Sequence, residues 1–177
     1  MKLVILDRDG TINHDSDEYI KSPEEWRPIK GSLEAIGRLV QAGYRVVVAT
    51  NQSGIARGLF DTKTLFAIHD LLQRSVAQAG GRVDAFFFCP HAADAGCACR
   101  KPQPGMLIEV ARRFNVPLED TYMVGDAQRD VEAAAAAGAR PVLVLTGKGR
   151  KTREAGKLPP GTEIYEDLAA FAERLAP

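Results

Sequence analysis

The chain has 177 residues, of which 45% are hydrophobic and 26% are charged, a composition that suits a soluble globular domain with a sizeable core. Its 23 Lys and Arg residues balance its 23 Asp and Glu residues, so charge gives no reason to expect a nucleic-acid or membrane partner. No apolar run is long enough for a transmembrane helix, and the short N-terminal run lacks the features of a signal peptide. We therefore expect a cytoplasmic protein.

Short apolar segments alternate with helical patterns along the chain. In order, the predicted elements are a strand at 3–6, a helix over 32–42, a strand at 45–49, a helix over 63–79, a strand at 85–88, a helix over 104–114, a strand at 122–124, a helix over 127–137, a strand at 142–145 and a helix over 166–176. The strands show little polar–apolar alternation, which is typical of parallel strands buried on both faces. This order predicts an α/β fold, a Rossmann-like parallel sheet flanked by helices.

Several residues indicate where helices begin and end. We expect Ser32 to cap the first helix, Gly43 to end it, and Gly138 to end the alanine-rich helix. Residues 147–161 are rich in Gly, Lys and Pro, and we interpret them as a mobile surface loop or as an edge of the active site.

Polar side chains follow each of the first four predicted strands. In sheets of this kind, ligands bind beyond the carboxyl ends of the strands, so these positions form the candidate site. They are Asp7 and Asp9 after the first strand; Thr50, Asn51, Gln52 and Ser53 after the second; Cys89, His91, Cys97, Cys99, Arg100 and Lys101 after the third; and Asp126 and Asp130 after the fourth.

These residue types fit the transfer of a phosphoryl group. Asp7 and Asp126 can bind one Mg²⁺ ion, which prefers oxygen ligands. Asp7 is also a candidate nucleophile that would form an aspartyl-phosphate, and Mg²⁺ together with the ammonium of Lys101 would relieve its repulsion from a phosphate. Thr50 can hydrogen-bond the phosphoryl oxygens. Asp9 can give a proton to the leaving oxygen and later take one from water.

The three cysteines of the chain lie within residues 89–99, where they form the pattern C-x-H-x5-C-x-C with one histidine. An odd, clustered set fits a metal site better than disulfides. Three thiolates and one imidazole suit tetrahedral zinc and leave no open position for catalysis. We therefore predict a structural Zn²⁺ site that stiffens the loop leading to Arg100 and Lys101, with the ligands Cys89, His91, Cys97 and Cys99.

Four segments together resemble the motifs of a known superfamily. They are DRDGT (7–11), VVVATNQSG (46–54), the lysine of CRKPQPGM (99–106) and VGDAQRD (124–130). Their order and spacing are similar to those of the haloacid dehalogenase-like (HAD) phosphatases over residues 1 to about 145. The resemblance implies dependence on Mg²⁺, with the nucleophile at Asp7, the acid/base at Asp9, phosphoryl contacts at Thr50 and Lys101, and metal ligands at Asp7, Asp126 and the main-chain carbonyl of Asp9.

The zinc pattern and the run TNQSGIARG (50–58) resemble one branch of that superfamily, which contains heptose bisphosphate phosphatases without a large cap domain. This resemblance implies removal of the 7-phosphate from a heptose 1,7-bisphosphate, on the route to ADP- or GDP-activated heptose for lipopolysaccharide. Histidinol-phosphate phosphatases are the alternative in the same branch. We expect residues 1–177 to form a single domain of this kind, with residues 89–101 as its zinc-binding loop, that acts as a monomer on a small-molecule sugar bisphosphate.

A sugar bisphosphate needs a second anion site and contacts for its hydroxyl groups. Arg100 is the first candidate for the second phosphate, with Arg57 and Lys148 as weaker ones. The candidate substrate contacts are Asp15, Asp17 and Tyr19 after the nucleophile loop, and Asn51, Gln52 and Ser53 beside Thr50. Several of these charged side chains could equally be solvated surface residues.

Two functions of other classes are alternatives. A signalling receiver domain also combines an aspartate with Mg²⁺, a threonine and a lysine, but it carries its phosphoacceptor after the third strand, and Asp9 would make dephosphorylation fast. An inactive binding module stabilised by zinc should have lost Asp7 or Asp9. Asp130 either supports the site from behind or caps the helix that follows it.

Overall fold

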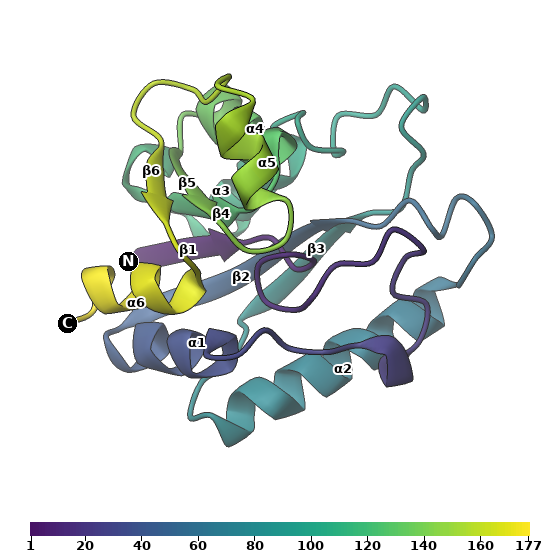
Figure 1. Cartoon of the computed structure of the whole chain (residues 1–177), viewed down its shortest axis with the longest axis horizontal. Helices are drawn as coiled ribbons and strands as arrows, with labels where there is room; N and C mark the ends of the chain where they lie inside the picture. Colours follow the sequence, from purple (N-terminus) through teal and green to yellow (C-terminus); the bar gives the residue numbers. More distant parts are fainter.

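The computed structural model covers residues 1–177 and is built on one parallel sheet of six strands in the order β3-β2-β1-β4-β5-β6 (Figure 1). The predicted Rossmann-like α/β fold is confirmed. In chain order the elements are β1 (Lys2–Leu6), the 3₁₀ turn η1 (Pro23–Glu25), α1 (Ser32–Gln41), β2 (Tyr44–Asn51), α2 (Thr62–Gln78), β3 (Ala85–Cys89), α3 (Gly105–Phe114), the 3₁₀ turn η2 (Leu118–Asp120), β4 (Tyr122–Gly125), α4 (Gln128–Ala137), β5 (Arg140–Val144), α5 (Gly149–Glu154), β6 (Glu163–Tyr165) and α6 (Leu168–Leu175).

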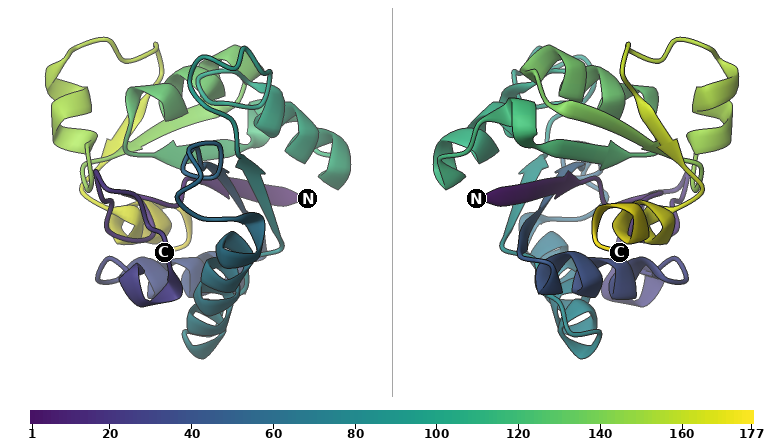
Figure 2. Two further views of the ribbon diagram at one scale, coloured as in Figure 1. Left: turned by 90° about the vertical axis from the view of Figure 1, so that its right-hand side faces the viewer. Right: turned by 90° about the vertical axis from the view of Figure 1, so that its left-hand side faces the viewer.

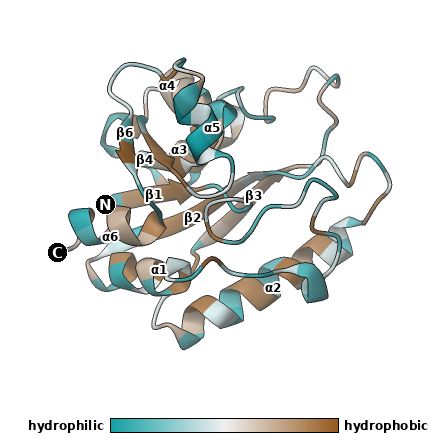
Figure 3. Ribbon diagram, in the orientation of Figure 1, coloured by the Kyte–Doolittle hydropathy of each residue, from teal (hydrophilic) through white to brown (hydrophobic).

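Helices cover both faces of the sheet (Figure 2). The apolar sides of α1, α2 and α6 pack on one face, where Ile36, Ile68 and Phe171 belong to one buried cluster with the strands. On the other face, Leu107 of α3 and Ala133 of α4 belong to a second cluster. Because the central strands are buried on both sides, they are apolar along most of their length (Figure 3). None of the helices combines the length and apolarity that crossing a bilayer would require.

The structure of segment 147–161 does not match the interpretation of this segment as a surface loop. It contains the short helix α5, and the strand β6 follows it at the edge of the sheet. Neither element carries an apolar pattern: α5 reads GRKTRE, and Ile164 in the three-residue β6 is 41% exposed. The alternative interpretation, an edge of the active site, agrees with the structure, since the backbone N–H of Lys148 donates to Asp126 at 2.7 Å.

The helix ends follow the predictions with one correction. Gly138 ends α4 with a φ of 77°, a left-handed conformation that glycine adopts without a steric penalty. Ser32, however, is not the cap of α1: Gly31 holds that position, and the Ser32 hydroxyl donates to the carbonyl oxygen of Ile12 at 2.6 Å. Ser32 therefore ties the first helix to the long loop after β1.

Gly37 allows close contact between α1 and the end of α2. A Cβ atom at Gly37 would clash with the carbonyl oxygen of Ala79. In an exposed helix, Gly→Ala stabilises by roughly 0.5–1 kcal/mol. Here we expect Gly37→Ala to destabilise by about 1–3 kcal/mol because the two helices must move apart.

Thermal unfolding measured by circular dichroism checks this expectation, with Glu34→Ala on the exposed side of α1 as the control. Gly37→Ala should melt several degrees below the wild type, whereas the control should melt near it. An unchanged or higher melting temperature for Gly37→Ala would show that the packing at this point is loose.

Candidate active site

Lys101 and Asp7 form the centre of a buried polar cluster at the carboxyl ends of the strands. Asp7 follows β1, and its backbone N–H donates to Val124 of β4 at 2.8 Å. The ammonium of Lys101 lies 2.9 Å from Asp7 Oδ1 and 2.7 Å from Asp130 Oδ1, and it donates to the carbonyl oxygen of Ala49 at 2.7 Å. Although burial disfavours its charged form, the carboxylates of Asp130 and Asp7 raise the pKa of Lys101.

The carboxylates of Asp7, Asp126 and Asp130 converge so that one oxygen from each lies within 4.8 Å of the others. Asp7 Oδ2 and Asp126 Oδ1 are buried without a hydrogen-bond partner. Burial and the neighbouring carboxylates raise the pKa of Asp7 to about 6 and that of Asp126 to about 8. These two oxygen atoms lack hydrogen-bond partners and lie in a cluster with excess negative charge. Such an arrangement fits a divalent cation such as Mg²⁺.

Gly10 makes room for this cluster. Its φ is 86°, and a Cβ atom at this position would clash with the carboxylate of Asp126. The carbonyl oxygen of Gly10 accepts a hydrogen bond from the Thr146 hydroxyl at 2.6 Å. The turn after Asp9 is thus packed against the loops that follow β4 and β5.

Asp9 has surroundings unlike those of Asp7. Its carboxylate accepts hydrogen bonds from Arg8 Nε at 2.8 Å, Asn13 Nδ2 at 3.0 Å and Gln52 Nε2 at 3.1 Å. Burial alone would raise its pKa, but the charge of Arg8 and these hydrogen bonds hold the pKa of Asp9 below its usual range. Its side chain is not part of the carboxylate cluster, so the predicted contact of Asp9 with the metal rests on its main-chain carbonyl.

Sequence reasoning assigned no role to Arg8, which contacts Asp9, or to His69, which contacts Arg8. Arg8 is fully buried, and its Nη1 lies 3.3 Å from Nε2 of His69 on α2. Burial and the charge of Arg8 lower the pKa of His69 to about 3, so the imidazole is neutral. His69 is 61 residues from Arg8 in the chain, and no local pattern could have linked them.

The last residues of β2 and the residue that follows them hold other parts of the site in place. The Asn51 amide pairs with the backbone of Lys101, donating to its carbonyl at 3.0 Å and accepting from its N–H at 3.1 Å. Gln52 donates to the Thr50 hydroxyl at 2.9 Å as well as to Asp9. Contact of Thr50, Asn51, Gln52 and Ser53 with substrate stays a prediction.

Other predicted residues lie outside the buried cluster and are exposed or half-buried. The Arg57 guanidinium lies 5.8 Å from the ring centre of Tyr19, and the Lys148 ammonium lies 3.4 Å from Asp15. Arg100 donates to the carbonyl oxygen of His91 at 3.4 Å. Asp130 fulfils both roles proposed for it, because it contacts Lys101 and its other oxygen accepts from the backbone N–H of Ala127 at the start of α4.

The structure brings the predicted zinc ligands together. The Cys89 and Cys99 sulfurs are 3.0 Å apart, Cys89 and Cys97 are 3.6 Å apart, and His91 Nδ1 is 3.3 Å from Cys99 Sγ. Such separations are compatible with four donors around one tetrahedral Zn²⁺. The chemistry of this donor set therefore fits structural zinc.

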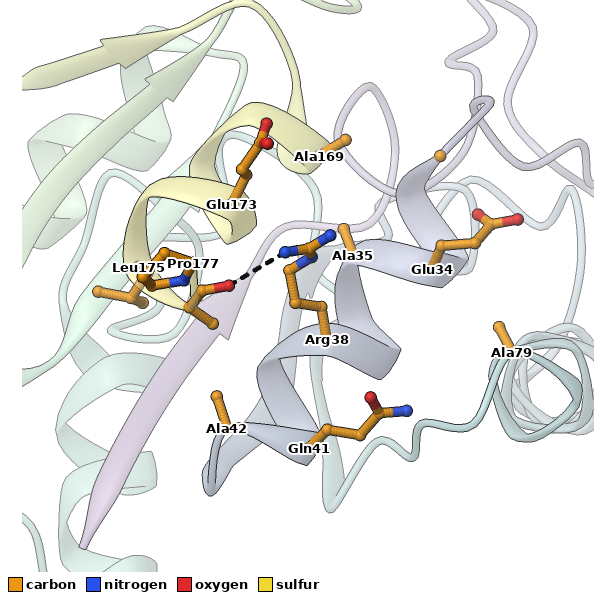
Figure 4. Close-up of a pocket in the computed structure, with 12 residues that line it drawn as sticks. Glu34, Ala35, Arg38, Gln41, Ala42, Ala79, Ala169, Glu173, Leu175 and Pro177 are labelled. Carbon is orange, nitrogen blue, oxygen red and sulfur yellow. Dashed lines mark hydrogen bonds between the residues drawn. The ribbon is translucent and has the colours of Figure 1, made fainter.

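A separate hollow of about 890 Å³ lies between α1 and α6 (Figure 4). There Arg38 donates to the carbonyl oxygen of Ala176 at 3.2 Å, and Glu34 and Glu173 lie nearby. Much of the rest of its lining consists of small side chains. It contains none of the carboxylate cluster, so we place the chemistry at the carboxyl ends of the strands and not in this hollow.

The fold and the carboxylate–lysine cluster define a class of protein, the HAD-like hydrolases. A family model described as HAD-hydrolase-like matches residues 98–171. Over 175 residues, the chain is 62% identical to D-glycero-beta-D-manno-heptose-1,7-bisphosphate 7-phosphatase of Bordetella bronchiseptica, covering 99% of this chain and 98% of the relative. The enzyme of the same name from Pseudomonas putida is 56% identical over 175 residues, and the alignment covers 99% of each chain.

Solved structures agree with these relatives. The D,D-heptose 1,7-bisphosphate phosphatase of B. bronchiseptica, complexed with magnesium and phosphate, has a TM-score of 0.97 and 62% identity, with 99% of this chain and 98% of that chain covered. The Burkholderia thailandensis enzyme has a TM-score of 0.80 and 52% identity over the same shares. The chain belongs to the D-glycero-beta-D-manno-heptose-1,7-bisphosphate 7-phosphatase family.

Replacement of Cys97 tests the zinc site. Cys97→Ser should lower the zinc content per chain, because a hydroxyl is a poorer ligand than a thiolate. Binding of structural zinc can supply on the order of 10 kcal/mol, so partial loss should also lower the melting temperature by several degrees.

The neighbouring substitution Ala98→Ser is the control, since it adds a hydroxyl and keeps all four ligands. Zinc is measured by elemental analysis after purification without chelators. Equal zinc content in Cys97→Ser and Ala98→Ser would contradict a site that uses Cys97.

Proposed function

We propose that this chain hydrolyses the 7-phosphate of D-glycero-beta-D-manno-heptose 1,7-bisphosphate through an aspartyl-phosphate on Asp7. The observation that carries the proposal is the buried cluster of Asp7, Lys101 and Asp126, in a chain that is 62% identical over nearly its full length to a phosphatase of that name. The proposal includes Mg²⁺ at the carboxylate cluster, zinc in the loop 89–101, and a single domain that acts as a cytoplasmic monomer.

Asp7 is the proposed nucleophile because its carboxylate stands at the buried end of the site beside an ammonium. Its oxygen forms a bond to phosphorus while the bond from phosphorus to the sugar oxygen breaks. Lys101 is held by Asp7, Asp130 and the Ala49 carbonyl, so its charge is fixed where negative charge develops. Mg²⁺ held by Asp7, Asp126 and the Asp9 carbonyl would neutralise the approaching phosphate.

Asp9 is the proposed proton carrier. The lowered pKa leaves its carboxylate ionised at neutral pH, which is the form that takes a proton from water for hydrolysis of the acyl phosphate. To protonate the leaving sugar oxygen, Asp9 must first take up a proton and give up some of its hydrogen bonds to Arg8, Asn13 and Gln52. The two carboxylates thus divide the work according to their surroundings.

A phosphate-release panel in the presence of Mg²⁺ tests the substrate. It contains the heptose 1,7-bisphosphate, fructose 1,6-bisphosphate, histidinol phosphate and sugar monophosphates. We expect kcat/KM for the heptose bisphosphate to exceed every other value by at least about tenfold, which corresponds to roughly 1.4 kcal/mol of discrimination. Preference for histidinol phosphate would assign the chain to the other activity of the branch.

The nucleophile is tested by Asp7→Asn. We expect kcat to fall by at least about 10³-fold, because an amide cannot form the acyl phosphate. Without added Mg²⁺ and without chelators, the melting temperature at pH 8 should not fall below that of the wild type, since the substitution removes one negative charge from a cluster in which Lys101 keeps Asp130 as its partner. Circular dichroism provides the folding control, and substantial remaining turnover would remove Asp7 from this role.

A further inference from the structure

Arg129 is a cation that the site described so far does not use. It is the second residue of α4, directly before Asp130. Its Nε is buried and has no hydrogen-bond partner, whereas the nearby Lys101 and Lys148 both form ion pairs. A buried donor without a partner reduces stability by roughly 1–3 kcal/mol. A cation in the first turn of a helix is also unfavourable with respect to the helix dipole.

The surroundings of Arg129 place its guanidinium at the active site. Burial opposes the charged form, but the carboxylates of Asp130, Asp7, Asp126 and, more weakly, Asp15 raise the pKa of Arg129. These carboxylates come from three segments at the carboxyl ends of the strands: the loop after β1, the loop after β4 and the first turn of α4. Arg129 also lines one hollow together with Lys101, so it lies beside the reacting groups, although no hydrogen bond or ion pair fixes it to them.

Arg129 separates two hollows at this edge of the protein. One has a volume of about 620 Å³ and is lined by Arg129, Arg100 and Lys101, with no carboxylate in its lining. The other has a volume of about 540 Å³ and is lined by Arg129, Lys148 and Lys151, with Glu132 as the one acid. In a chain with no net charge, this concentration of cations fits an anion.

We propose that Arg129, together with Arg100, binds the phosphate that the enzyme does not remove. This inference rests on the proposed function, because it requires a bisphosphate substrate. Lys101 is already held by Asp7 and Asp130 and serves the reacting phosphoryl group. A sugar that carries phosphates at opposite ends needs a second anion site in addition to Lys101, and the planar forks of two guanidinium groups match phosphate oxygens.

Steady-state kinetics of Arg129→Gln and Arg129→Lys test the inference with two substrates, the heptose 1,7-bisphosphate and the heptose 7-phosphate. The quantity compared is the specificity ratio, kcat/KM for the bisphosphate divided by kcat/KM for the monophosphate. We expect Arg129→Gln to lower this ratio about 10–100-fold, mainly through KM for the bisphosphate. Arg129→Lys should restore part of it, because the charge remains and the fork is lost.

Arg74→Gln is the matched control, since Arg74 is an exposed cation of α2 that pairs with Asp70. It should keep the wild-type ratio. An unchanged ratio in a folded Arg129→Gln, with strong bisphosphate preference in the wild type, would overturn the assignment of Arg129 and leave the proposed function intact. An equal fall for both substrates would also overturn it, because Arg129 would then act on the reacting group. A wild-type ratio near one would overturn the inference alone, because the second phosphate would then contribute nothing to binding, whereas absence of bisphosphate turnover in the wild type would overturn both proposals.

Discussion

The active site depends on one buried ammonium held between carboxylates. Lys101 is fully buried and lies within 3 Å of both Asp7 and Asp130, and Asp126 stands in the same cluster. Three carboxylates around one ammonium leave an excess of negative charge in a place that water cannot screen, which costs stability. The parallel sheet brings the four residues together because Asp7 and Asp126 follow the adjacent strands β1 and β4. The same excess of negative charge favours a divalent cation at this cluster, and the cation together with Lys101 would then reduce the repulsion of a phosphate.

The position of Lys101 is fixed from two directions. On one side, the Asn51 amide at the end of β2 pairs with both backbone groups of Lys101. On the other side, Lys101 follows Cys99 by two residues, and Cys99 belongs to the cluster of sulfur and imidazole donors. The segment 90–104 between β3 and α3 contains no helix or strand that would hold it. A metal that joins Cys89 at the end of β3 to Cys99 therefore links this loop directly to the sheet.

Sequence patterns predicted the central sheet because each strand is an apolar run, and they predicted the carboxylate cluster because its members follow strands in order. They failed where a role depends on contacts between distant residues. His69 has the surroundings of a core residue on α2, and only the folded chain places its ring against Arg8 and stacks it on Phe86, with ring centres 4.4 Å apart. In the sequence, Arg129 is indistinguishable from a solvated helix residue. Only the folded structure shows that it lines two hollows.

Asp7 and Asp9 show how two residues in one tripeptide acquire opposite properties. Asp7 lies at the carboxyl end of β1, where burial and the carboxylate of Asp130 raise its pKa. One of its carboxylate oxygens has no hydrogen-bond partner. Asp9 faces Arg8, Asn13 and Gln52, which lower its pKa. Arg8 lies between them in sequence, yet its guanidinium turns to Asp9 and His69 and not to Asp7. If Arg8 instead neutralised Asp7, the cluster would lose the excess negative charge that fits a cation, and Asp9 would lose the charge that keeps it ionised. The direction of this one buried side chain therefore separates the carboxylate that we propose as a metal ligand from the one that we propose as the proton carrier.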